Sequence, residues 1–152
     1  MKNVISITML SLVLGACASN DTAQVVDEAP IKYKDLSLKE QRDSVKEYWV
    51  VEKRQEPKYP LAAAKKGLSG CVDLIVGINQ DGKTSGYKVK SSYPKGVFDN
   101  HAAASLKKWK WSATEVNIDR APVLTSIQLD FMVSGAKNAK EAKSKCGWDY
   151  KV

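Results

Sequence analysis

The sequence predicts an α+β domain in which a short helix is followed by the order β-β-α-β, with a three-stranded antiparallel sheet packed on helices. Two observations carry this prediction. From Gly70 onward apolar side chains recur at every second position, as in a half-buried strand, and they are Val72, Leu74, Val76 and Ile78. Further along, the apolar spacing lengthens to four, four and three at Phe98, Ala102, Leu106 and Trp109. That stripe is typical of a helix lying on a sheet.

The first element is a short helix expected near residues 38–47. Ser37 and Glu40 fit the Ser-x-x-Glu pattern of a capping box, and apolar residues then recur at helical spacing. Residues 48–51 read as a brief extended segment, and Pro57 and Pro60 bracket a bend.

The next unit begins a second short helix. Pro60 suits its first turn, the alanines that follow suit its interior, and Gly67 suits its C-terminal cap. After the first strand, Asp81-Gly82 marks a tight hairpin turn, and Lys83 to Ser91 forms the second strand. Val123 to Val133 alternates cleanly and predicts the last strand, whereas the Lys- and Ala-rich tail from Ser134 has no strong period.

The N-terminus has the layout of a secretory signal. Lys2 gives a positive start, Val4 to Leu14 is apolar, and Leu14-Gly15-Ala16-Cys17 follows. These four residues resemble the lipobox of bacterial lipoproteins, which implies removal of residues 1–16 and acylation of Cys17. An ordinary signal peptide with a chance cysteine is the alternative. The remaining chain divides into a tether at 17–36, a helix and lead-in at 37–56, a domain at 57–133 and a tail at 134–152.

Composition and cysteine content limit the chemistry. The chain is 43% apolar and 27% charged with a net charge of +7, which we interpret as a solubilising surface, because export argues against nucleic acid. If Cys17 carries lipid, Cys71 and Cys146 remain, and an oxidising compartment favours a disulfide over two free thiols. A metal site, a cofactor and catalysis are not expected, because His101 is the only histidine and no catalytic motif is present.

The order of elements, together with the turn and cap residues between them, resembles the TonB C-terminal domain family from about Val51 to Val133. The matching segments, each weak alone, are Pro57-Lys58-Tyr59-Pro60, Ala62-Ala63 with Lys65-Lys66-Gly67, Gly70-Cys71-Val72, Asp81-Gly82-Lys83, Ser91-Ser92, Phe98-Asp99 and Leu106-Lys107-Lys108-Trp109-Lys110-Trp111. One departure is Ala113, where the family commonly has proline.

The resemblance implies a protein-binding role rather than an enzymatic one. In the family, the last strand offers its edge to a short N-terminal segment of outer-membrane receptors by strand addition. Carried over, that strand is Val123 to Val133, and the segment around Tyr59 and Pro60 lies near the partner, although these two residues also suit a plain turn and helix start. The expected contact residues on the strand are Val123, Thr125, Ser126, Ile127, Gln128, Leu129, Asp130 and Phe131.

Three hypotheses stay open on sequence alone. The chain is a periplasmic lipoprotein that docks on TonB-dependent receptors or related envelope proteins, a structural or regulatory envelope lipoprotein that binds another periplasmic protein or the cell wall, or a conventional transducer with an uncleaved N-terminus. The third is the weakest, because full-length transducers carry a long Pro-rich spacer and this chain has five prolines in all. Ala18 after Cys17 implies the periplasmic leaflet of the outer membrane. A homodimer formed through sheet edges is left open.

Overall fold

The computed structural model describes residues 30–149, so the expected signal peptide and Cys17 lie outside the described residues. None of the helices within that range is long and apolar enough to cross a membrane. In chain order the elements are β1 (Lys34–Leu36), a 3₁₀ helix η1 (Lys39–Ser44), α1 (Val45–Tyr48), β2 (Trp49–Lys53), α2 (Leu61–Lys66), β3 (Gly70–Ile78), β4 (Thr84–Tyr93), α3 (Asp99–Leu106), β5 (Lys110–Ala113), β6 (Val123–Phe131) and α4 (Ala139–Cys146).

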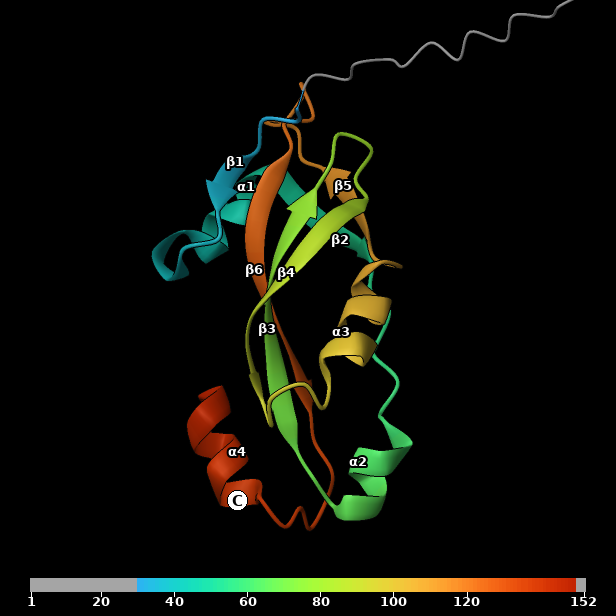
Figure 1. Ribbon diagram of the computed structural model, residues 1–152. Coiled ribbons are helices and arrows are strands. Elements are labelled where there is room, and N and C mark those ends of the chain that lie inside the picture. Colours follow the sequence, from blue (N-terminus) through green and yellow to red (C-terminus); the bar gives the residue numbers. More distant parts are fainter. Residues whose placement is uncertain (1–29, 150–152) are drawn as a thin grey trace, which may run out of the picture. The chain divides into compact units, whose positions relative to one another are not determined.

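The main sheet has four strands in the order β1-β6-β3-β4 (Figure 1). β3 pairs with β6 along its whole length, from Gly70 opposite Phe131 to Ile78 opposite Val123. β4 pairs antiparallel with the other side of β3, with two register shifts. These three strands confirm the predicted antiparallel sheet, and β1 adds a short parallel strand beside β6.

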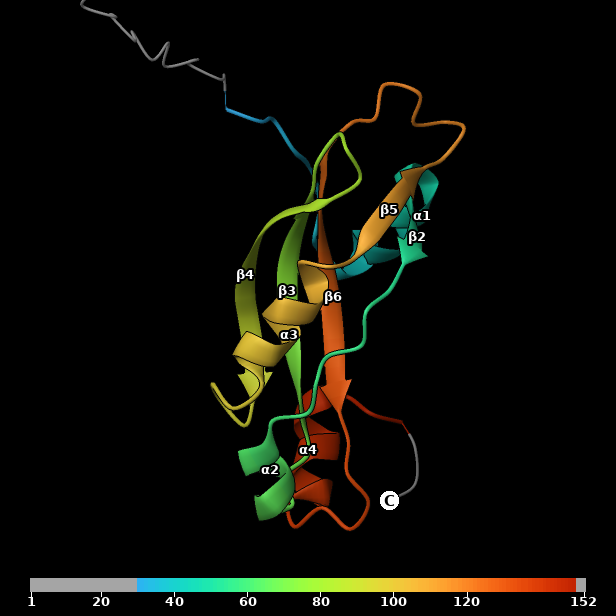
Figure 2. The ribbon, with the colours of Figure 1, turned by 90° about the vertical axis from the view of Figure 1, so that its right-hand side faces the viewer.

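A separate two-stranded sheet joins β2 and β5, whose register runs from Trp49 opposite Ala113 to Lys53 opposite Lys110 (Figure 2). The extended segment expected at 48–51 is therefore one strand of a pair. Its partner was not predicted, because Lys110–Ala113 directly follows the helical stripe and reads as the end of that helix.

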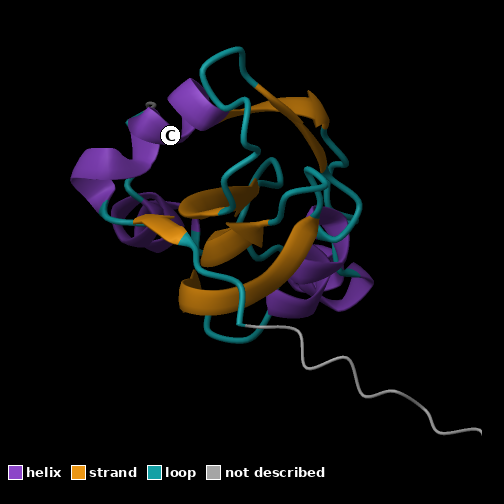
Figure 3. Ribbon diagram, turned by 90° about the horizontal axis from the view of Figure 1, so that it is seen from above, coloured by secondary structure: helices purple, strands orange, loops and turns teal. Residues whose placement is uncertain are grey.

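Helices cover both faces of the main sheet (Figures 1 and 3). The face that carries Val72, Leu74, Val76 and Ile78, here called the helix face, packs against α2 and α3, and all four side chains have no exposed surface. The opposite face, here called the disulfide face, carries Cys71, which is bonded to Cys146 of α4 (Cα–Cα 5.8 Å). Trp148 is buried in the small cluster around this bond.

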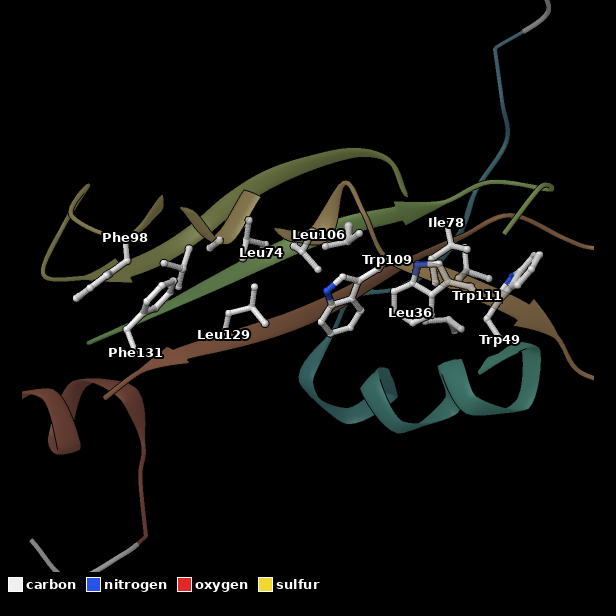
Figure 4. Close-up of a cluster of buried hydrophobic side chains, with 14 of the residues drawn as sticks. Leu36, Trp49, Leu74, Ile78, Phe98, Leu106, Trp109, Trp111, Leu129 and Phe131 are labelled. Carbon is white, nitrogen blue, oxygen red and sulfur yellow. The ribbon is translucent and has the colours of Figure 1, made fainter. Parts of the chain in front are cut away.

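The core on the helix face is a continuous row of side chains (Figure 4). At one end the rings of Phe98 and Phe131 stack with their centroids 4.4 Å apart, and Tyr59 meets both rings edge-on. At the other end the row closes on Trp49 and Trp111. Trp109, expected in the core from its place in the stripe, is 5% exposed.

The first predicted helix differs from the structure in detail. Residues 39–48 form η1 followed by α1, and neither has a side-chain cap. Ser37 does not act as a capping-box residue, because both its hydroxyl and its backbone N–H donate to the carboxylate of Asp35 (2.7 and 2.9 Å). The serine therefore bonds to a nearby carboxylate instead of to the backbone N–H groups at the start of the helix.

Of two chain reversals predicted from glycines, one agrees with the structure and one differs from it. α2 ends at Gly67 in the left-handed conformation, as its sequence predicts. The β3–β4 turn is longer than the tight hairpin expected from Asp81-Gly82. It spans residues 79–83, with Gly82 at φ +69° and the side chain of Asn79 accepting from the backbone N–H groups of Asp81 and Lys83.

The two ends of the domain also differ from expectation. The tether was expected to reach residue 36, but Lys34–Leu36 forms β1 and Leu36 is 4% exposed. The sequence of the tail predicts no secondary structure, yet Ala139–Cys146 is helical. Only Ala142 and Cys146 of α4 are buried, so its apolar signal was too short to detect.

Candidate protein-binding edge

β6 has one side that is only partly paired. On the β3 side it is fully occupied, whereas on the other side β1 pairs only from Lys34 opposite Val123 to Leu36 opposite Thr125. Among the described residues, no strand pairs with this outer side of Ser126–Phe131, here called the free edge.

The direction of the backbone groups follows from two hydrogen bonds. Pro122 accepts from the N–H of Lys34 on the outer side (2.9 Å), and Val133 donates to the Ser69 hydroxyl on the β3 side (3.0 Å). Because backbone groups alternate from one residue to the next along a strand, the N–H and C=O of Gln128 and Asp130 point outward. The free edge therefore offers unpaired donors and acceptors in strand geometry.

A groove of about 530 Å³ runs beside the free edge, and we call it the edge groove. Its near wall is formed by Thr125, Ser126, Gln128 and Asp130 of β6, and its floor holds Trp109, Trp111 and Ile127. Its far wall comes from η1, α1 and β2, and the residues there are Arg42, Asp43, Val45, Lys46, Val50, Val51 and Arg54.

Two of the three tryptophans around the groove, Trp49 and Trp109, are held in place by hydrogen bonds to the backbone. The indole N–H of Trp109 donates to the carbonyl of Gln55, and that of Trp49 donates to the carbonyl of Ala121 (both 2.9 Å). Trp109 and Trp111 lie in contact, with ring centroids 5.6 Å apart. The floor is thus apolar, and an incoming side chain could cover the 5% of each of these two tryptophans that stays exposed.

The far wall carries three basic side chains, Arg42, Lys46 and Arg54, and one acidic one, Asp43. Lys46 pairs with Asp43 (3.2 Å), and the guanidinium of Arg54 pairs with Glu56 (2.7 Å) while lying over the ring of Trp109. Val50 and Val51 are 46% and 45% exposed, so apolar surface is also available on this wall. The groove therefore combines unpaired backbone groups, an apolar floor and exposed positive charge.

Comparison with known proteins decides the family. Residues 55–133, just over half of the chain, match the family described as the Gram-negative bacterial TonB protein C-terminal. The chain belongs to the TonB C-terminal family. This family's domain is a non-enzymatic protein-interaction module, and its last matched strand is β6.

Individual relatives agree with this membership. Protein TonB from Xanthomonas campestris pv. campestris, in strains B100 and ATCC 33913, is 32% identical over 78 residues, which cover 51% of this chain and 35% of each relative. The chain thus matches about a third of the length of these relatives. The solution NMR structure of the Pseudomonas aeruginosa TonB C-terminal domain shares the fold, with a TM-score of 0.50 and 19% identity over 66% of this chain and 94% of that one.

The strand residues expected from the TonB resemblance to contact a partner fall into two groups, those in the core and those that line the edge groove. Val123, Thr125, Leu129 and Phe131 are 0–2% exposed, so their side chains belong to the core, and their backbone groups point to β3 rather than to the free edge. β1 already occupies the outer side at Val123 and Thr125, which corrects the expectation that the whole strand offers an edge. Ser126, Ile127, Gln128 and Asp130 line the edge groove.

Tyr59 and Pro60 lie away from the edge groove. Pro60 precedes the first turn of α2, and Tyr59 packs on Phe98 and Phe131 and donates its hydroxyl to the carbonyl of Leu68. Burial raises the pKa of the Tyr59 phenol. The role that the structure gives this pair is local packing, and contact with a partner there stays a prediction.

The disulfide face supports the edge from behind. Asp73 accepts from the hydroxyl of Ser126 (2.6 Å) and lies 3.6 Å from the ammonium of Lys90. The side-chain amide of Gln128 donates to the backbone carbonyl of Cys146 (3.0 Å). The sequence did not predict the far wall of the groove. Its residues come from the segment before the recognised domain, and the neighbouring tryptophans were the only signal for it.

Proposed function

We propose that this chain is a periplasmic protein-binding module that takes an extended segment of an envelope protein onto the free edge of β6. The segment we favour is the N-terminal periplasmic part of a TonB-dependent outer-membrane receptor. The observation that carries the proposal is the outward direction of the Gln128 and Asp130 backbone groups, beyond the end of β1. Membership in the TonB C-terminal family supports it.

Strand addition fits the groove in a specific way. Backbone pairing supplies affinity that tolerates changes of sequence, and alternate side chains of an added strand would point into the groove and away from it. The inward side chains meet Trp109, Trp111 and Ile127, which favours apolar residues there. Arg42 and Lys46 on the far wall favour a partner segment that also carries acidic residues.

The test is an NMR titration of the exported chain carrying Cys17→Ser, with peptides from the N-terminal segments of the source bacterium's receptors. We expect the largest amide shifts at Ser126–Phe131 and on the far wall of the groove. The control is the same peptide N-methylated at alternate residues, which keeps the side chains and removes backbone donors, and it should bind weakly. Shifts centred elsewhere, or equal binding of the methylated peptide, contradict the proposal.

We further propose that Cys17 carries the lipid anchor and that the protein sits on the periplasmic leaflet of the outer membrane. The support is the Leu14-Gly15-Ala16-Cys17 motif followed by Ala18. Such a protein would act as an accessory, regulatory or substitute docking module rather than as a powered transducer. Incorporation of labelled palmitate, lost in Cys17→Ser, tests the anchor. Recovery of most of the protein with the inner membrane would overturn the placement.

A further inference from the structure

The chain places a strand of its own on the edge that the proposed partner uses. β1 lies parallel to β6, with Lys34, Asp35 and Leu36 opposite Val123, Leu124 and Thr125. The N–H of Lys34 donates to the carbonyl of Pro122 at 2.9 Å, and this bond points to the same outer side as the groups of Gln128 and Asp130. β1 and the free edge are therefore two parts of one continuous edge (Figure 1).

Few contacts hold β1 in place. Leu36 is its one buried apolar side chain, at 4% exposed. Just before the strand, Tyr33 shares a hydrogen bond with Ser85 (2.7 Å) and covers Gly77, where a Cβ would come within 3.3 Å of the ring. Lys34 reaches the hydroxyl and ring of Tyr48. A three-residue strand at a sheet edge is among the less stable parts of a fold.

A side-chain turn marks the point where β1 leaves the edge. The carboxylate of Asp35 accepts both the N–H and the hydroxyl of Ser37, and η1 begins shortly afterwards. β1 therefore ends opposite Thr125 and the free edge starts at Ser126. A partner strand confined to Ser126–Phe131 can bind beside β1, whereas a longer one meets β1 end to end.

We propose that β1 is an intramolecular competitor for the partner strand, so that the β6 edge is short while β1 is docked and extends to Val123 when β1 leaves. This inference rests on the proposed function. The physical reason is that the backbone groups of β6 from Pro122 to Leu124 cannot pair with β1 and with a partner at once. A partner that needs the long edge binds only the fraction of molecules in which β1 is detached, and its apparent affinity falls by that fraction.

The test compares Lys34→Pro with Lys34→Ala in the full chain. Both variants remove the side-chain contact with Tyr48, but only proline removes the N–H that bonds Pro122. Two probes are used. One is a synthetic peptide of residues 31–38, which can fill the vacated β1 position in trans, and the other is a receptor N-terminal peptide prepared in a short and a long form.

We expect Lys34→Pro to bind the 31–38 peptide and the long receptor peptide at least about tenfold more tightly than Lys34→Ala, with little change for the short form. In the wild-type chain, the long peptide should speed hydrogen exchange at the amides of residues 34–36. Equal affinities in the two variants, or amides of β1 that stay protected with the long peptide bound, would overturn the proposal. Failure of receptor peptides alone, with the 31–38 peptide still binding Lys34→Pro, would count against the proposed function and leave the competition intact.

Discussion

The side-chain amide of Gln128 donates to the backbone carbonyl of Cys146 at 3.0 Å, so the strand that forms the free edge is tied to the helix that carries the disulfide. Gln128 also donates to the carboxylate of Asp130 (2.9 Å) on the same face of the sheet. α4, the Cys71–Cys146 bond and the edge strand thus form one connected unit on the disulfide face. Loss of the disulfide should therefore disturb the structure of the free edge.

Removal of the disulfide should destabilise the domain strongly. The bond joins residues separated by 75 positions, and the chain-entropy relation gives about 4 kcal/mol for a loop of that size. We expect Cys71→Ser with Cys146→Ser to lower the free energy of unfolding by a large part of that amount, measured by urea denaturation. Cys17→Ser, which leaves the bond intact, is the control. Two freely alkylated thiols in the unreduced, denatured wild-type protein would show that the bond does not form.

A glycine at the start of β3 should be irreplaceable. A Cβ at Gly70 would lie 1.8 Å from the carbonyl oxygen of Tyr93 and 2.8 Å from the ring of Phe98, so the strands would have to separate. We expect Gly70→Ala to lower the free energy of unfolding by about 3 kcal/mol or more. Gly86→Ala on the adjacent strand is the matched control, because nothing lies within 4 Å of its Cβ position. Similar effects of the two substitutions would contradict this packing.

The turn after β1 should give stability that depends on pH. Hydrogen bonds from the hydroxyl and then the backbone N–H of Ser37 lower the pKa of Asp35. Because the folded pKa is the lower one, the stabilisation is present above the unfolded pKa and is lost as the pH falls through the folded value.

We therefore expect Asp35→Ala to lower the melting temperature near neutral pH, with the difference from wild type shrinking in acid. Ser37→Ala supplies the control background, in which Asp35→Ala should add much less pH dependence. A difference that is the same at neutral and acidic pH in both backgrounds would show that this turn does not carry the effect.

The central part of the fold could be predicted from the sequence because its apolar periodicity is unambiguous and continues over many residues. β3 alternates over nine residues, and the stripe from Phe98 to Trp109 places α3 on the sheet. The bond between Cys71 and a cysteine of the tail followed from the expected oxidising compartment and from the even number of cysteines left after lipidation. The strand that carries the free edge, β6, was likewise visible from its alternation between Val123 and Phe131.

The remaining elements had too little local signal. β1 has three residues and one buried side chain, Leu36, so nothing distinguished it from a tether. β5 owes its strand conformation to pairing with β2, a contact between residues about sixty positions apart, which local pattern does not encode. The far wall of the edge groove depends on that same pairing. The site was therefore predicted as a strand, whereas the groove beside it and the pairing of β1 with it were found only in the tertiary structure.

The most direct measurement of the central claim compares the affinity of Gln128→Pro and Gln128→Ala for a receptor N-terminal peptide. Both substitutions remove the side-chain bonds to Cys146 and Asp130, but only proline removes the outward N–H, and neither removes a bond to β3. The account predicts similar melting temperatures for the two variants and a peptide affinity roughly tenfold lower for Gln128→Pro, the loss of about one hydrogen bond. Equal affinities in two folded variants would contradict strand addition at this edge.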